Sequence, residues 1–316
     1  MPVTLEQARQ NTTDDIDLAI IDEFRTNDIM ELLTFDDAVN PAGGGATLTY
    51  GYRRLAELAT AGFRALNTEY TPGEVSTTRH TTELKVLGGA FQIDRVLANL
   101  GPAATNEVWL QMTQKVRAVQ AEFGNAVING DSAEDEDSFD GLSKALAGSS
   151  TEVDASGWDW SNITEAAEAL AILDALDDFL GNLDEQPQAI ITNKAVIAKL
   201  RAAARRANMY AREAGPRGSY FETYGGVRLI DAGKRAGDNQ DVIPVDSDGT
   251  TDMYAVRFGL DGFHGVSTAG GNLVSQWTPD FTTPGAVKTG EVELGPVGVA
   301  LKKTKAAAVA RDVKVR

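Results

Sequence analysis

The sequence contains no cysteine and only two histidines, and none of its apolar runs is long. Without cysteine the chain has no disulfide, thiolate nucleophile, zinc ribbon or iron–sulfur site, so its stability must come from packing or assembly. No apolar run approaches the roughly 18 residues that cross a bilayer. The opening residues MPVTLEQARQ also lack the charged-then-apolar pattern of a signal peptide. We therefore expect neither membrane insertion, nor a membrane partner, nor signal-directed export.

Positive charge is also scarce. The chain has 29 Lys and Arg against 46 Asp and Glu, a formal net charge of −17. Because phosphate binding relies on Lys and Arg, this balance argues against a protein that coats nucleic acid over its whole surface. The hydrophobic content of 42% is ordinary for a globular chain, and 316 residues suffice for two domains or one elongated one.

The search for catalytic residues finds no complete constellation. His80 and His264 are the only side chains with an unperturbed pKa near neutrality, and both fit structural positions better than catalytic ones. The run Gly265-Val266-Ser267-Thr268-Ala269 approaches the nucleophile elbow of serine hydrolases, but it ends in Ala and no helix pattern follows. The carboxylate clusters lack calcium-loop spacing. We expect no enzyme, and no catalytic, cofactor-binding or metal site.

Three long segments have the apolar periodicity of amphipathic helices. The strongest lies between Gly101-Pro102 and Asn129-Gly130, where apolar residues recur at steps of three and four. The core residues expected of this helix are Trp109, Met112, Val116, Val119 and Phe123. Two more helices are expected at about 162–180 and 194–212, with a buried strand at 189–192 between them. The rest is typical of short strands and turns, so the pattern favours an α+β fold.

A long polar excursion lies in the N-terminal half. ATLTYGYRRL and VSTTRHTTELKVL are strand-like, and the residues between them are rich in turn formers. The returning half, TPGEVSTTRHTTELKV, is rich in β-branched residues yet has almost no apolar face. A two-stranded ribbon of this length is marginal in water, so we expect it to contact something outside itself. Before it, Gly43, Gly44 and Gly45 indicate a hinge.

The order of these elements resembles that of the major capsid protein of tailed double-stranded DNA bacteriophages, which has the Hong Kong 97-type fold. AIIDEFRTNDIMELLTFDDA is similar to the N-terminal arm of that family. FRALNTEYTPGE with LKVLGGAFQIDRVLA looks like its extended loop and the start of its peripheral domain, and NAVINGD like the end of its spine helix. QAIITNKAVIAKLR resembles the strand-to-helix step of its axial domain, and YGGVRLID, DVIPVD and MYAVRFGLDGF its later strands.

The resemblance implies a division of the chain into five parts. These are an N-terminal arm (1–42), an extended β-hairpin loop (43–88), a peripheral domain with the spine helix (89–143), an axial domain (144–282) and C-terminal strands returning to the peripheral domain (283–316).

The resemblance also implies a structural role. The chain would self-assemble as hexamers and pentamers into an icosahedral head that encloses double-stranded DNA, and would reside in the virion after assembly in the host cytoplasm. The extended loop would lie over a neighbouring subunit. The loop residues expected to make this contact are Arg53, Arg54, Arg64, Tyr70, Arg79, His80 and Glu83. Some members join subunits through a loop lysine; here no lysine precedes Lys85 in the loop, so we expect non-covalent contacts.

Further partners are implied in the same way. Because the N-terminal arm is short, we expect a separate scaffolding protein, with a portal and a decoration protein as other partners. Contact with packaged DNA would be weak and non-specific. The residues that could face DNA are Lys302, Lys303 and Lys305, although their alternation equally fits the outer face of a strand.

Two alternatives stay open at the level of sequence. An encapsulin-like nanocompartment would share the fold but enclose an enzyme instead of a genome. A soluble serine hydrolase would use Ser267 with His264.

Overall fold

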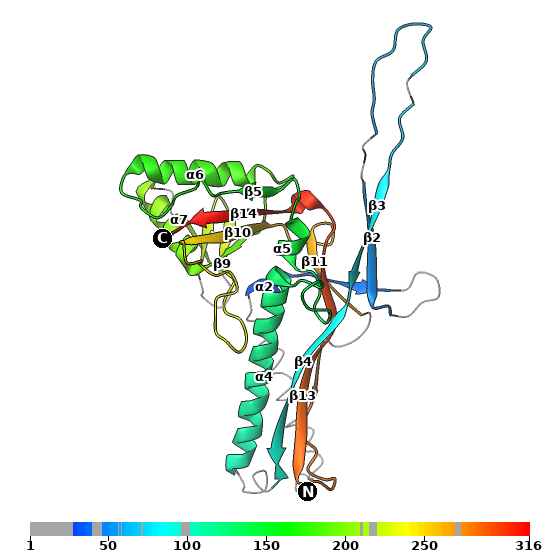
Figure 1. Cartoon of the computed structure of the whole chain (residues 1–316), viewed down its shortest axis with the longest axis vertical. Helices are drawn as coiled ribbons and strands as arrows, with labels where there is room; N and C mark the ends of the chain where they lie inside the picture. The colour runs from blue at the N-terminus through cyan, green and yellow to red at the C-terminus, as the bar shows by residue number, and fades with distance from the viewer. Residues whose placement is uncertain are drawn as a thin grey trace.

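The computed structural model describes residues 28–39, 46–55, 57, 59–70, 72–95, 102–208, 211–214, 220–268 and 273–316. The expected hinge, Gly43 to Gly45, and most of the expected N-terminal arm lie outside the described residues. The molecule is elongated (Figure 1). A seven-stranded sheet with its helices forms the broad part, a long helix and a five-stranded sheet extend from it in one direction, and a two-stranded hairpin points in the other.

The five-stranded sheet and helix α4 (Pro102–Asn129) form the narrow part of the molecule. The strands of this sheet are β1 (Phe35–Ala38), β11 (Phe263–Thr268), β13 (Val287–Leu301), β12 (Val274–Trp277) and β4 (Lys85–Asp94). Antiparallel β4 and β13 pair along most of their lengths, and α4 packs on both. The short helices α2 (Asp28–Leu32) and α5 (Leu142–Leu146) lie near this part.

The spine helix buries most of its predicted apolar face. Met112, Val116, Val119 and Phe123 are each at most 3% exposed, since steps of three and four keep them on the side that faces the sheet. Trp109 is 52% exposed, so its predicted place in the core is wrong. Periodicity predicts the face on which a residue lies, but it does not predict how much of the sheet lies opposite that turn of the helix.

The seven-stranded sheet is buried on both faces at its centre. Its strands, in spatial order, are β5 (Glu152–Asp154), β14 (Ala307–Lys314), β10 (Thr250–Val256), β6 (Ala189–Thr192), β9 (Val227–Asp231), β8 (Tyr220–Tyr224) and β7 (Ala211–Ala214). Ile190 and Ala255 belong to the cluster around helices α6 (Ala166–Leu180) and α7 (Lys194–Arg206). Ile191 and Tyr254 belong to the cluster around α4. Double burial explains why β6 is a continuous apolar run instead of an alternating one.

Strand β14 corrects the expected assignment of residues 283–316. The first strand of that segment, β13, pairs with β4, but β14 lies between β5 and β10 in the seven-stranded sheet. The prediction that the whole segment returns to the peripheral domain is therefore wrong for β14. The short 3-10 helix η2 (Thr304–Ala306) separates the two strands, and the alternation within each strand does not say which sheet it joins.

Helix α7 begins directly after strand β6 because of one residue. The side-chain oxygen of Asn193 accepts hydrogen bonds from the main-chain N–H groups of Ala195 and Val196, at 3.0 and 3.1 Å. The helix ends at Arg206, before the predicted Arg212, and Asn208 takes the left-handed conformation with φ of 56° that stops helices. Among the described residues, none of the helices combines the length and apolar character that a membrane crossing needs.

Candidate assembly surface: the hairpin arm and its root

The hairpin consists of β2 (Thr49–Leu55), β3 (Thr77–Glu83) and the segment between them, and we call residues 46–83 the arm. Cross-strand pairing sets Tyr52 opposite His80 and Arg53 opposite Arg79. Successive side chains point to opposite faces of a strand. Tyr52 and His80 therefore share a half-buried inner face, which turns towards the body, and the two arginines share an exposed outer face.

Arg54 attaches the arm to the body of its own chain. Its guanidinium donates hydrogen bonds to the main-chain oxygens of Leu301 and Lys302, the latter at 3.1 Å from Nε. The same group lies 5.5 Å from the ring centroid of Tyr52, on which His80 stacks at 5.6 Å. A hydrogen bond from a charged guanidinium to a main-chain carbonyl is stronger than one between two neutral groups. Of the predicted contact residues, Arg54 is thus engaged within the chain.

A second set of contacts fixes the root beside β1. The Tyr50 hydroxyl donates a 2.6 Å hydrogen bond to Asp36 Oδ2, and Lys302 Nζ lies 3.4 Å from the same oxygen. The Tyr50 hydrogen bond, with Lys302 as a smaller contribution, lowers the pKa of the Asp36 carboxyl. The positive charge of Lys302 is therefore balanced by the Asp36 carboxylate. Lys303, although exposed, likewise forms an ion pair with Asp184. Of the three lysines predicted to face DNA, Lys305 is the exposed one that forms no ion pair with a described residue.

His264 lies buried under this root. It is 0% exposed, its ring meets Tyr50 edge-on at 5.7 Å, and neither ring nitrogen has a hydrogen-bond partner among the described residues. Ser267 follows three positions later on β11, so it points to the opposite face of the strand. A serine hydrolase needs its base within hydrogen-bond reach of the nucleophile. The Ser267–His264 alternative therefore has no supporting geometry.

We expect His264 to make the protein less stable in mild acid. Burial, followed by the nearby Lys302, lowers the pKa of His264 below 6.5, although the Gly262 main chain, Asp36 and Asp261 act in the opposite direction. Below about pH 6.5 the unfolded chain binds a proton there that the folded chain does not, so the free energy of unfolding falls by up to about 1.4 kcal/mol per pH unit. Urea unfolding between about pH 7 and pH 5 measures this slope.

The matched variants for this test are His264→Phe and His80→Asn. The first should remove most of the slope, and the second should keep most of it because His80 is only half-buried. An unchanged slope in His264→Phe would contradict the assignment.

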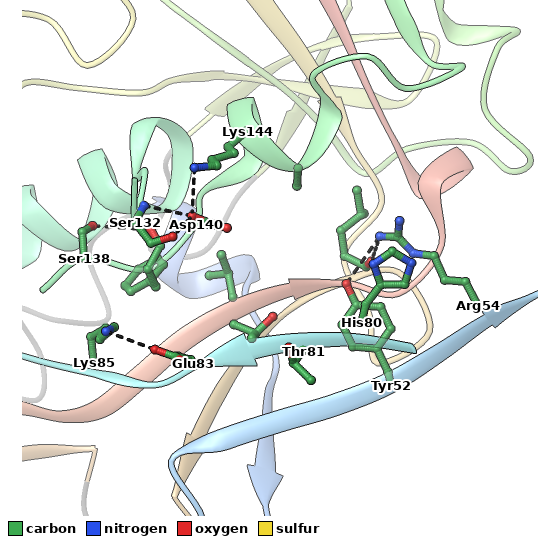
Figure 2. Close-up of a pocket in the computed structure, with 15 residues that line it drawn as sticks. Tyr52, Arg54, His80, Thr81, Glu83, Lys85, Ser132, Ser138, Asp140 and Lys144 are labelled. Atoms are coloured by element: carbon green, nitrogen blue, oxygen red, sulfur yellow. Dashed lines mark hydrogen bonds and ion pairs between the residues drawn. The ribbon is translucent and has the colours of Figure 1, made fainter. Parts of the chain in front are cut away.

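A cavity of about 410 Å³ separates the inner face of the arm from the acidic loop 131–141 (Figure 2). Tyr52, Arg54 and His80 line it from the arm, and Ser132, Asp140 and Lys144 line it from the loop and α5.

Local ion pairs occupy the charges around this cavity. Lys144 pairs with Asp131 and Asp140, and the Ser132 hydroxyl donates a 2.7 Å hydrogen bond to Asp140. Lys85 Nζ lies 3.2 Å from Glu83 Oε2 and donates to the main-chain oxygen of Glu136 at 2.8 Å. Glu83, a predicted intersubunit residue, is therefore paired within its own chain. Within the described parts of the chain, no three His, Asp or Glu residues are grouped as metal ligands.

The tip of the arm carries large side chains that are mostly exposed. Phe63 is 111% exposed, Leu66 90% and Tyr70 64%, and the tip extends far from every other element (Figure 1). Arg64 lies 5.3 Å from the Tyr70 ring centroid and donates to the main-chain oxygens of Ala65 and Thr68. Sequence reasoning selected Arg64 and Tyr70 but missed Phe63 and Leu66, whose signal was an apolar pair within a polar, turn-rich stretch.

Replacing Arg54 by Ala is expected to loosen the arm at its root. Losing the guanidinium bonds should lower the opening free energy of β2 and β3 by about 1.4 kcal/mol, which raises amide hydrogen exchange in these strands about tenfold. Hydrogen–deuterium exchange on dissociated subunits measures this increase in the exchange rate. Lys305→Ala, which removes an exposed charge nearby, is the control and should leave the arm unchanged. Equal exchange in both variants would show that the two carbonyls do not anchor the arm.

Comparison with known proteins rests on structure. No family model and no curated protein matches the chain. The holo-SrpI encapsulin complex from Synechococcus elongatus PCC 7942 matches 91% of this chain and 87% of its own, with a TM-score of 0.61 and 18% identity. The capsid of Myoviridae Phage XM1 matches 87% and 89%, with a TM-score of 0.54 and 14% identity. A virus-like particle from Pyrococcus furiosus matches 94% of this chain and 98% of its own, with a TM-score of 0.52 and 11% identity. The chain has the Hong Kong 97-type fold, of the α+β class.

Proposed function

We propose that this chain is a structural shell subunit, the major capsid protein of a tailed phage, whose copies form an icosahedral head around double-stranded DNA. The observation that carries the proposal is the arm, a hairpin that leaves the body and presents unpartnered apolar side chains at its tip. Exposed apolar groups gathered at one place mark an interaction site. The matched structures support copies of the same chain as the partner, because they are encapsulin, phage and virus-like shells.

Repetition of one arm contact accounts for the proposed assembly. A contact between the tip of one copy and the body of the next uses two different surfaces, so it continues from copy to copy and closes into a ring. Pentamers and hexamers are rings of this kind. In them we place the seven-stranded sheet at the ring centre, as the axial domain, and α4 with the five-stranded sheet at the periphery. Burying Phe63 and Leu66 contributes about 1.5–3 kcal/mol each at every repeat.

The proposed contacts are non-covalent and the protein is no enzyme. No lysine occurs in the described part of the arm, and Lys85 at its root is engaged with Glu83 and Glu136. The unpaired His264 gives no nucleophile–base pair with Ser267. Two of the three lysines proposed for DNA contact are neutralised by carboxylates, which supports a weak, non-specific contact with the genome.

Assembly of the purified protein tests the proposal. Sedimentation velocity and negative-stain electron microscopy should show closed shells or ring-shaped capsomers. The same measurements with the products of neighbouring genes test for a separate scaffolding protein, a portal and a decoration protein. A chain that stays monomeric both alone and with those products would contradict the proposal.

An encapsulin-like nanocompartment is the second candidate, because an encapsulin is among the matched structures. The content of the particles separates the two. Phage heads assembled in infected cells should contain double-stranded DNA, measured by ultraviolet absorbance and nuclease protection. Particles that lack nucleic acid and instead hold a co-purifying enzyme, identified by mass spectrometry, would favour the nanocompartment.

A further inference from the structure

Two arginines face each other on the outer side of the arm. Arg53 and Arg79 occupy directly opposed positions of β2 and β3, and both side chains are exposed. Like charges directly opposite one another destabilise an antiparallel pair. The guanidinium of Arg79 lies across Gly51, where an added Cβ would be 3.5 Å from its terminal nitrogen. The hairpin thus carries a repulsive pair at the middle of its exposed face.

Neither arginine has a counter-ion within the part of the chain that the structure describes. No ion pair or hydrogen bond joins Arg53 or Arg79 to any described residue. The carboxylate on the same face, Glu83, is held by Lys85 at 3.2 Å. Tyr52, Arg54 and His80 of the hairpin line the cavity beside the acidic loop of the same chain, whereas Arg53 and Arg79 do not line it. No described group of the chain therefore balances the charge of the pair.

We propose that the arginine pair binds carboxylates of the acidic loop, Glu134–Asp137, of a second copy of this chain; this inference rests on the proposed shell function. The loop presents four exposed carboxylates, and none of them forms an ion pair with a described residue. The nearby cation Lys144 is taken by Asp131 and Asp140, and Lys85, which pairs with Glu83, donates to the loop only at the main-chain oxygen of Glu136. The arginine pair and the loop are thus of opposite charge, and neither forms an ion pair with a described residue.

Carboxylates fit the pair of Arg53 and Arg79 better than nucleic-acid phosphates do. The planar guanidinium fork binds carboxylate and phosphate alike. A polyanion lying along the arm, however, would also meet the exposed Glu57, Glu69 and Glu74. A short acidic loop meets only the arginines. With a net charge of −17 per chain, copies repel one another, and a local cation–anion match at the contact offsets that repulsion and sets the register.

Charge reversal on both sides tests the inference. Arg53→Glu with Arg79→Glu should reduce shell yield about tenfold or more. Charge reversal in the loop, by Glu134→Lys with Glu136→Lys and Asp137→Lys, should reduce shell yield by a similar factor. The two arm changes and three loop changes together should restore assembly. Asp135 is left unchanged because its side chain accepts a 3.0 Å hydrogen bond from the Asp137 main chain. Arg53→Lys with Arg79→Lys keeps the charge and should keep most of the yield, and thermal unfolding verifies that each subunit folds.

Each outcome has a distinct meaning. A wild-type chain that forms no particles, either alone or with the products of the neighbouring genes, contradicts the shell function itself. If the wild type assembles and the variant with Arg53→Glu and Arg79→Glu assembles equally well, the arginine–loop contact is wrong but the shell function is not. Failure of the five changes to restore assembly overturns the loop as the partner. Normal shells with a reduced nucleic-acid content, measured after nuclease treatment, would mean that the arginines bind phosphate, which also overturns it.

Discussion

A chain in which Phe63, Leu66 and Tyr70 are all replaced by serine is expected to fold normally and to fail to assemble. These side chains are 111%, 90% and 64% exposed and belong to none of the core clusters, so the free energy of unfolding should change by no more than about 0.5 kcal/mol. At the contact between copies, losing two fully buried apolar side chains removes about 3–6 kcal/mol, which weakens each contact by more than about a hundredfold.

Sedimentation velocity and electron microscopy measure this loss, and circular dichroism verifies the fold. The matched control is Phe63→Leu with Leu66→Met and Tyr70→Phe, which alters shape but keeps the tip apolar. The control should assemble at a yield close to that of the wild type. Shells formed by the serine variant at wild-type yield would show that the tip carries none of the assembly energy.

Replacing Phe123 by Ala should give the largest loss of subunit stability among the changes considered, about 3–5 kcal/mol. Phe123 is 0% exposed, and its ring centroid lies 6.3 Å from that of Phe35 and 6.1 Å from that of Phe139. Removing the ring leaves a cavity between the spine helix, β1 and the acidic loop. Urea unfolding of dissociated subunits measures the cost as a change in the transition midpoint.

Trp109→Ala on the same helix is the matched control. Trp109 is the larger side chain, but because it is 52% exposed we expect its removal to cost less than about 1 kcal/mol. Equal costs for the two changes would mean that the apolar stripe of α4 is buried uniformly. That result would contradict the placement of Trp109 outside the core.

Local pattern was enough to predict much of the fold. The spine helix, the buried strand β6 and the start of α7 are predicted from apolar periodicity and from a short apolar run between two helix patterns. Each of these signals lies within one short stretch of sequence. The two sheets did not follow from pattern, because the pairing of β14 depends on strands far away in the chain.

The charged residues of the candidate surface show the limit of sequence reasoning more clearly. Arg53 and Arg54 look alike in sequence, yet Arg54 bonds to a carbonyl 248 positions away while Arg53 faces solvent. Lys302 and Glu83 likewise find partners within the chain. Alternation along β2 shows that neighbouring residues point to opposite faces. It does not show which face meets the body, and that assignment decides which charges stay free for a partner.

The place of β14 also constrains when a newly synthesised chain can become competent for assembly. Among the described strands, β5 has β14 as its only neighbour in the sheet, and β10 needs β14 on one side, so the sheet stays incomplete until the ribosome has released residues 307–314. The carbonyls of Leu301 and Lys302 that anchor the arm are made only just before them. Neither a finished sheet nor an anchored arm can therefore form before residues 301–314 have left the ribosome.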